Sequence, residues 1–310
     1  MLFDAAMGHV EHLIVLVYDF VRQTVPSETR VQWMRENHPD VDFRIIQNPE
    51  PLRRFDPETY GPLAREFLGD RRIDLVITSE PYGEGLARIF GARWHSVDRD
   101  RVAIPATSTM IRRNPLDHLA LLHPNVRAHY VKRVTVVGAE STGKTSICEY
   151  LSQYFATSWV PEYGRAYSLV KTQAGNLGRW SSDEFFHIAR EQQRIENEAA
   201  RSANRLLICD TDAYSTRIWH ERYLGHDVQR WPFDDPKTSL YLIPYPDVSF
   251  VAEAVRDSEH LRFWMYERFV DEFKARGYSY EVLDGDYDER RAKAVASIAN
   301  LLAIPPPPSY

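Results

Sequence analysis

The amino-acid sequence predicts an α/β fold made of two doubly wound parallel-sheet domains. Short β-branched apolar runs alternate with amphipathic stretches along both halves of the 310 residues, a rhythm typical of βαβ units. A chain of this length is long for one hydrophobic core and suits two. A glycine-rich loop, Gly138 to Thr145, also stands between a predicted strand and a predicted helix in the second half.

The first half contains four predicted strands and three predicted helices. A stretch from Pro115 to Ala128 then has the character of a linker. We therefore expect a first domain over 1–128, a second over 131–303 and a proline-rich tail over 304–310. The predicted strands are 12–18, 43–46, 73–78 and 94–97, and the predicted helices are 27–37, 57–68 and 84–90.

The second half repeats the alternation of strand and helix, which predicts a second parallel sheet. The predicted strands are 131–137, 158–160, 206–209, 240–243 and 280–283, and the predicted helices are 144–155, 183–204, 260–276 and 288–302.

The composition favours a protein that acts on small molecules. A net charge of −6 and a pI near 6.0 argue against nucleic acid as a partner, which usually requires a basic surface. No apolar run approaches the length of a membrane span, and the N-terminus lacks a secretory signal. The two cysteines, Cys148 and Cys209, are too few for a disulfide framework. We expect a cytoplasmic protein without a membrane partner, and a homo-oligomer remains open.

The glycine-rich loop matches G-x-x-x-x-G-K-[ST] in the strand–loop–helix context that this phosphate-binding loop requires. Its backbone N–H groups would surround the phosphates of ATP, Lys144 would reach the β- and γ-phosphates, and Thr145 would offer its hydroxyl to Mg²⁺. ATP and Mg²⁺ are therefore the expected cofactors. The ATP-binding residues are Gly138, Ala139, Glu140, Ser141, Thr142, Gly143, Lys144 and Thr145.

Acidic residues follow two further strands of the second half. Asp210 ends an apolar strand and is expected to hold Mg²⁺. Glu162 follows another strand, so it should lie at the same carboxyl edge as the phosphate loop, where a carboxylate can accept the proton of an attacking hydroxyl. Asp212 is the alternative base, or it caps the next helix. Arg165 can contact substrate or phosphate.

Three arginines, Arg256, Arg262 and Arg268, lie on or near one predicted helix. We expect Arg256 to act as a lid residue that brings positive charge to the transferred phosphoryl group, and the other two to be solvated. Aromatic residues that could stack on a nucleoside base are Trp159, Trp180, Tyr214 and Trp219, but the sequence does not select among them.

The second half resembles the kinase part of the NadR-type family, which joins a nicotinamide-nucleotide adenylyltransferase to a ribosylnicotinamide kinase. The resemblance rests on the phosphate loop, Pro-Glu-Tyr-Gly-Arg at 161–165, Asp-Thr-Asp at 210–212, Arg-Asp-Ser at 256–258 and Gly-Asp-Tyr-Asp-Glu-Arg at 285–290. It implies transfer of the ATP γ-phosphoryl group to the 5′-hydroxyl of nicotinamide riboside. The family pattern W-x-x-D-G-x-R appears here with Phe250 and Glu253 in place of its Trp and Asp. The implied substrate-binding residues are Glu162, Tyr163, Arg165, Phe250 and Glu253.

The first half resembles the adenylyltransferase part of the same family. Thr-Ser-Glu-Pro-Tyr-Gly at 78–83 and Ala-Thr-Ser-Thr-Met-Ile-Arg at 106–112 carry this resemblance, the latter being similar to the family's I-S-x-T-x-I-R phosphate-binding element. The first strand and the histidine-containing phosphate loop of the family are not found. We therefore expect a nucleotidylyltransferase-like domain that is inactive. Thr107, Ser108, Thr109 and Arg112 would be the remaining part of its site.

Two other functions are compatible with the phosphate loop alone. One is a nucleotide-dependent regulatory switch, but no Asn-Lys-x-Asp base reader follows strand 240–243, and Thr211 stands where a motor-type ATPase usually has a second acid. The other is a kinase for a different nucleoside, such as a deoxynucleoside.

Overall fold

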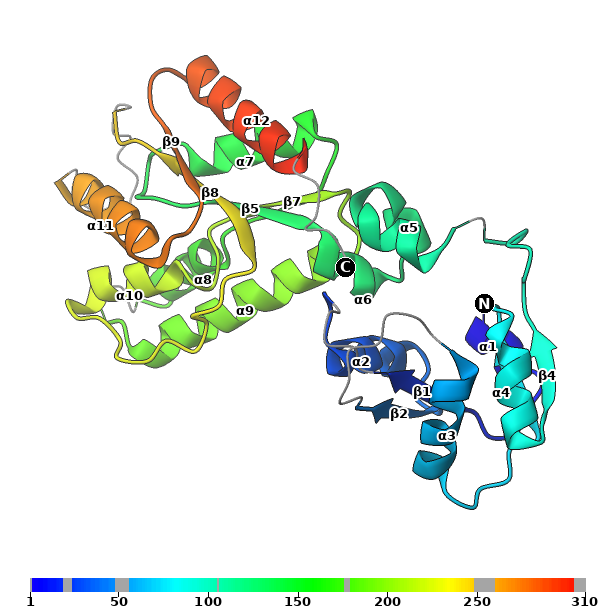
Figure 1. Ribbon diagram of the computed structural model, residues 1–310. Helices are drawn as coiled ribbons and strands as arrows, with labels where there is room; N and C mark the ends of the chain where they lie inside the picture. The colour runs from blue at the N-terminus through cyan, green and yellow to red at the C-terminus, as the bar shows by residue number, and fades with distance from the viewer. Residues whose placement is uncertain are drawn as a thin grey trace. The chain divides into compact units, whose positions relative to one another are not determined.

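The computed structural model of the chain describes residues 2–18, 24–47, 56–104, 106–175, 179–247 and 260–303. It divides into two compact units, Met1–Asn114 and Pro115–Pro305 (Figure 1). The predicted proline-rich tail, 304–310, lies outside the described residues. No helix in the described ranges is long and apolar enough to cross a membrane.

The first unit contains two pairs of parallel strands. Strand β1 (Ile14–Tyr18) pairs with β2 (Asp42–Ile46), and β3 (Leu75–Thr78) pairs with β4 (Arg93–Ser96). Among the described residues no hydrogen-bonded ladder joins the two pairs. A doubly wound sheet is continuous because a central strand joins its two halves, and the described part of this unit contains no strand paired with both β1 and β3.

The described part of this unit has five helices, of which α2 packs against β1 and β2 and α4 packs against β3 and β4. Helix α3 starts at Asp56, whose carboxylate accepts hydrogen bonds from the N–H groups of Glu58 and Thr59. Its buried residues Tyr60 and Ala64 share one apolar cluster with residues of both strand pairs. The helices are α1 (Leu2–Met7), α2 (Ser27–Asn37), α3 (Pro57–Leu68), α4 (Tyr82–Phe90) and α5 (Ser108–Arg113).

The second unit is built on a five-stranded, wholly parallel sheet with the order β6-β7-β5-β8-β9. The strand that precedes the phosphate loop, β5, is therefore in the centre of the sheet. The α/β class with parallel sheets is confirmed. The strands are β5 (Lys132–Val136), β6 (Trp159–Val160), β7 (Leu206–Asp210), β8 (Thr238–Pro244) and β9 (Tyr280–Leu283).

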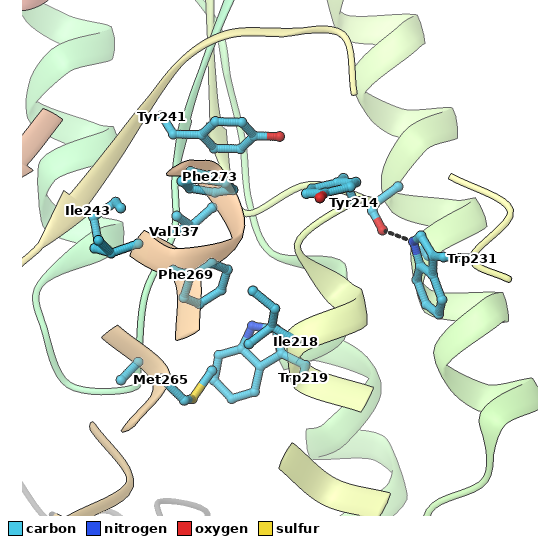
Figure 2. Packing of buried hydrophobic residues seen from close by; sticks show 14 of the residues in the cluster. Val137, Tyr214, Ile218, Trp219, Trp231, Tyr241, Ile243, Met265, Phe269 and Phe273 are labelled. Atoms are coloured by element: carbon cyan, nitrogen blue, oxygen red, sulfur yellow. Dashed lines mark hydrogen bonds between the residues drawn. The ribbon is translucent and has the colours of Figure 1, made fainter. Parts of the chain in front are cut away.

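Helices cover both faces of this sheet (Figure 1). On one face, α7 and α12 pack on β5, β7 and β8 through a fully apolar cluster. On the other face, α9, α10 and α11 bury an aromatic-rich cluster that includes Trp219, Tyr241, Phe269 and Phe273 (Figure 2). The helices are α7 (Lys144–Tyr154), α8 (Tyr163–Gln173), α9 (Ser182–Ala200), α10 (Thr216–Leu224), α11 (His260–Arg276) and α12 (Tyr287–Ala303).

The boundary between the units lies at Asn114 and Pro115 rather than near residue 128. The expected linker forms a 3₁₀ helix, η1 (Pro115–Leu121), and helix α6 (Pro124–Tyr130). Its apolar side chains pack against α9 and β7, with Leu119 in one buried cluster with Leu207. The prolines suggested a linker, but the leucines between them supply enough apolar surface to join the second core.

Candidate functional site

The phosphate loop connects the centre of the sheet to helix α7. Its backbone is left-handed at Ser141 (φ 59°) and at Gly143 (φ 86°). At position 143, glycine adopts this conformation without strain. The buried side chains of Thr142 and Lys144 both donate to the carbonyl of Ala139, each at 2.9 Å. The loop is therefore closed around the lysine ammonium group, which stands at the start of α7, where a helix N-terminus favours anions.

The predicted metal-binding residues lie together at the end of the neighbouring strand. The Thr145 hydroxyl donates to Oδ2 of Asp210 at 2.7 Å. The other carboxylate oxygen, Oδ1, is buried and has no hydrogen-bond partner among the described residues. Burial raises the pKa of Asp210, against the opposing effect of Lys144. A Mg²⁺ ion would satisfy the free oxygen and stabilise the ionised carboxylate, so these two residues fit the ion.

The residue after Asp210 is held in an unusual conformation. Thr211 has a φ of 66°, which is unfavourable for a β-branched residue. Its hydroxyl lies 2.9 Å from that of Ser215, and the residue lines the cavity described below. The local backbone strain turns the chain immediately beyond the metal-side carboxylate, where such strain often accompanies function.

Glu162 stands at the N-terminus of α8, directly after β6. Because β6, β7 and β5 are adjacent, their carboxyl ends bring Glu162, Asp210 and the phosphate loop to one edge of the sheet. Burial raises the pKa of Glu162 to about 7, with Lys144 opposing the rise and the Asp210 carboxylate adding to it. A carboxyl group with this pKa can accept and release a proton near neutral pH.

These groups line one cavity of about 410 Å³, which is within the range of small-molecule sites. Lys144, Thr145, Glu162 and Arg165 line it, as predicted residues of the site. Four aromatic residues also line the cavity, and we call them the aromatic wall; the ring centre of one of them, Trp219, lies 5.7 Å from the Lys144 ammonium group. The aromatic wall consists of Trp180, Phe185, Trp219 and Tyr223.

The aromatic wall is assembled from two helices and the loop that precedes one of them. The ring of Trp180 lies 5.1 Å from that of Phe185 and 5.2 Å from that of Tyr223, distances typical of packed aromatic pairs. The sequence named Trp180 and Trp219 among its stacking candidates without selecting them. Trp159 and Tyr214 are absent from the cavity lining, and Tyr214 is instead buried in the core.

Three arginines of the second unit are more buried than the sequence predicted. Arg262 is 3% exposed and its guanidinium lies 3.5 Å from the carbonyl oxygen of Ser141, so the expectation that it is solvated is wrong. Arg268 is also mostly buried and pairs with Glu221 and Glu272. The charge pattern of a helix alone could not show which face packs inward.

Arg290, from the family-like segment at 285–290, is a third such cation. It is 1% exposed and donates to three carbonyl groups: that of Thr142 in the phosphate loop, that of Gly285 and that of Tyr245. It also pairs with the Asp247 carboxylate. This arginine therefore fixes the back of the phosphate loop to the ends of β8 and β9.

Asp212 and Tyr163 lie outside the cavity lining, as do Asp210 and three residues of the phosphate loop, Gly138, Ala139 and Thr142. The carboxylate of Asp212 accepts hydrogen bonds from Ser215, Thr238 and Tyr241 at 2.6–2.9 Å, which suits a structural role at the start of α10. The Tyr163 side chain packs against His187, with its hydroxyl 3.2 Å from the imidazole. Three further predicted residues, Phe250, Glu253 and Arg256, lie outside the described residues.

The predicted site residues of the first unit form the start of α5. Thr107 caps this helix by accepting a hydrogen bond from the N–H of Met110 at 3.0 Å. Arg112 donates to the hydroxyl of Thr109 at 3.4 Å. Arg112 and Thr109 are exposed, and so is Ser108, the first residue of the helix. These contacts keep the segment helical.

Comparison with known proteins agrees with this geometry. A family model described as an AAA domain matches residues 133–290. The "Trifunctional NAD biosynthesis/regulator protein NadR" of Escherichia coli (strain K12) is 25% identical over 77% of this chain, and the Salmonella typhimurium protein of the same name is 25% identical over 66%. The chain spans about 60% and 51% of the length of these two relatives.

Two solved structures share the fold over nearly the whole chain. A NadR protein in complex with NR aligns with a TM-score of 0.73 and 20% identity, covering 97% of this chain and 91% of that one. A NadR protein in complex with NAD and AMP-PNP aligns with a TM-score of 0.72 and 20% identity, covering 99% and 93%. The resemblance to NadR that the motifs indicated is confirmed, and so is the α/β fold.

Proposed function

We propose, from the premise that this chain belongs to the AAA domain family, that its second unit transfers the γ-phosphoryl group of ATP to the 5′-hydroxyl of nicotinamide riboside. One observation carries the proposal. A single cavity is lined by the phosphate loop, by a carboxyl group with a pKa of about 7 and by an aromatic wall. The phosphates of ATP, the group that accepts the proton and the ring of the nucleoside can therefore all bind in the same cavity.

The donor end would act mainly by positioning and by charge. The N–H groups of the phosphate loop and Lys144 bind the phosphates, and Thr145 with Asp210 would hold Mg²⁺, which when bound neutralises charge on the phosphate oxygens. Phosphoryl transfer requires little covalent help from the protein. The similarity to a NadR protein solved with NAD and AMP-PNP supports ATP as the donor.

Glu162 is the proposed base. Its ionised carboxylate would orient the 5′-hydroxyl and receive its proton as the oxygen attacks the γ-phosphorus. Asp212 is less suited to this step because its oxygens accept four hydrogen bonds from neighbouring groups. Arg165, which lines the same cavity, would contact the phosphoryl group or the ribose.

The acceptor end suits a flat, positively charged ring. The aromatic faces attract a cation through their quadrupole, and the carboxylates of Glu149 and Glu162 line the same cavity. The nicotinamide ring of the riboside is a pyridinium cation, whereas the bases of the common nucleosides are neutral. Similarity to NadR, solved elsewhere in complex with NR, supports the same acceptor.

A panel of nucleosides tests the acceptor. The purified chain is incubated with Mg²⁺-ATP and either nicotinamide riboside, adenosine, deoxyadenosine or thymidine, and the monophosphates are separated and quantified. We expect nicotinamide riboside to be phosphorylated with the highest kcat/KM. A higher kcat/KM for a deoxynucleoside would assign the site to a different kinase, and nucleotide hydrolysis indifferent to every acceptor would favour the regulatory switch.

A further inference from the structure

Arg222 on α10 contacts both the phosphate loop and the aromatic wall. Its side chain is only 4% exposed, and its guanidinium lies 3.5 Å from the carboxylate of Glu140 in the phosphate loop. The same guanidinium lies 5.1 Å from the ring centres of both Trp219 and Tyr223. It also contacts the sulfur of Met265 on α11 at 3.5 Å.

Glu140 places a negative charge where another negative charge must bind. It belongs to the phosphate loop and lines the cavity beside Lys144, so its carboxylate would repel the phosphates of ATP if nothing neutralised it. The Arg222 guanidinium is a positive charge in contact with that carboxylate, and the pair is mostly removed from solvent. Such a contact is screened much less than one on the surface.

The aromatic rings under Arg222 belong to the acceptor end. Trp219 and Tyr223 line the cavity as half of the aromatic wall. Figure 2 shows Trp219 and Met265 at the same edge of the apolar cluster formed by α10 and α11. A base that stacks on these rings would restrict their rotamers, and the guanidinium stacked on them would be restricted with them.

We propose that Arg222 is a positioning residue that couples the two ends of the cavity. A base seated on Trp219 and Tyr223 holds the guanidinium against Glu140, and the neutralised carboxylate lets the phosphate loop bind ATP more tightly. By reciprocity, ATP raises the affinity for the acceptor by the same factor. This inference rests on the proposed function, because it takes the aromatic wall to be the acceptor end.

Calorimetric titration of the full chain with AMP-PNP and Mg²⁺, with and without saturating nicotinamide riboside, measures this coupling. In the unmodified protein we expect the riboside to lower the Kd of AMP-PNP by at least about fivefold. Arg222→Met keeps the length of the side chain without its charge. We expect it to raise the Kd about tenfold without riboside and to reduce the effect of riboside to less than about twofold.

A second substitution separates charge from structure. Adding Glu140→Gln to Arg222→Met removes the carboxylate that Arg222 contacts, so the Kd without riboside should return to within about threefold of the unmodified value. A direct contact between Arg222 and the phosphates, or a merely structural role, would not be rescued in this way. Arg217→Met is the matched control, since it removes another arginine of α10, one that pairs with Asp227 instead, and it should leave the coupling unchanged.

Three results would overturn the inference: no effect of riboside in the unmodified protein, full coupling in folded Arg222→Met, or no rescue by Glu140→Gln. Failure of the proposed function looks different. Coupled binding of AMP-PNP and riboside without formation of a monophosphate would refute the kinase and leave the coupling in place. If Arg222→Met formed the monophosphate and kept the full coupling, the kinase function would be supported and the role of Arg222 refuted.

Discussion

At the scale of single residues, the proposed chemistry depends on the protonation state of Glu162. Burial raises its pKa to about 7, so the carboxyl group is protonated in acid and ionised above neutrality. A base must be ionised to accept a proton, and kcat/KM should therefore rise as pH increases through about 7. Measuring kcat/KM from pH 5.5 to 9 tests for this rise.

Substitution of the base distinguishes the two candidate carboxylates. Glu162→Gln keeps the shape of the side chain and should lower kcat at least about a hundredfold, with loss of the rise near pH 7. Asp212→Asn should act through stability, because it disturbs the hydrogen bonds from Thr238 and Tyr241. If Glu162→Gln kept kcat within about threefold while Asp212→Asn abolished it, the base would be Asp212.

The phosphate loop gives a second prediction. Lys144→Ala should remove phosphoryl transfer while the far-ultraviolet circular dichroism and the melting temperature stay close to those of the unmodified protein, because the lysine acts on transition-state charge. Near-normal turnover in a folded Lys144→Ala protein would contradict the ATP site. Thr145→Ala should raise the Mg²⁺ concentration needed for half-maximal rate, since it removes the hydroxyl beside Asp210.

Sequence reasoning succeeds for some of these residues and not for others. The position of the phosphate loop between β5 and α7 was predictable because its eight residues are contiguous. The position of Asp210 at the end of β7 was predictable because it ends an apolar run. The aromatic wall was not, because Trp180 and Tyr223 are separated by more than 40 residues of chain and meet only when α9 packs on α10. The role of Asp212 depends on hydrogen bonds from β8, which sequence does not show.

At the scale of elements, helix α9 links the sheet to the catalytic edge. Its Gln192 accepts a hydrogen bond from the N–H of Tyr163, the first residue of α8, at 2.9 Å. The amide group of Gln192 then donates to Glu196 at 3.0 Å. Burial raises the pKa of Glu196 to about 8 from 4.5, although the Arg133 guanidinium nearby opposes the rise. The folded protein therefore holds this proton more tightly than the unfolded chain.

Stability should depend on pH accordingly. Since the folded state binds the extra proton between about pH 4.5 and 8, the free energy of unfolding contributed by Glu196 falls as pH rises through this range. Glu196→Gln should flatten the decline in melting temperature between pH 5 and 8, as measured by differential scanning fluorimetry. Glu198→Gln, at an exposed position of the same helix, is the control. If the melting temperature of Glu196→Gln fell as steeply with pH as that of the unmodified protein, Glu196 would not be the source of the pH dependence.

The helices and strands were largely predictable where apolar residues recur at a regular spacing along the chain. Helices α2, α3 and α11 have the predicted ends. Helices α8 and α10 were not predicted, and α8 has no buried residue. Such a helix lacks the apolar stripe that sequence patterns detect. Its stability comes instead from its N-terminal contact with Gln192 and from packing on α9.

At the scale of the whole molecule, the described parts of the two units differ in the continuity of their sheets. The AAA domain match, 133–290, lies entirely within the second unit, whose sheet is continuous. In the first unit the described strands form two separate pairs, and the segment with Thr107 and Arg112 is exposed. No described loop in that unit combines glycines with a helix N-terminus in the manner of the phosphate loop.

We propose that the first unit does not carry out adenylyl transfer. Incubation of the 310-residue protein with Mg²⁺-ATP and nicotinamide mononucleotide should yield no NAD above the rate without protein. Detection of NAD by an alcohol dehydrogenase cycling assay is sensitive enough to decide this. Lys144→Ala, which leaves the first unit intact, is the control. Robust NAD synthesis in either protein would show that the first unit forms a competent site.

The proposed kinase function depends on one cavity that serves donor and acceptor together. The most direct measurement follows ADP and nicotinamide mononucleotide at the same time in one reaction with Mg²⁺-ATP, with and without nicotinamide riboside. We predict that both products form in a ratio of about one to one and that ADP formation nearly stops when riboside is omitted. ADP formed at the same rate without riboside, and no nicotinamide mononucleotide with it, would contradict the proposed function.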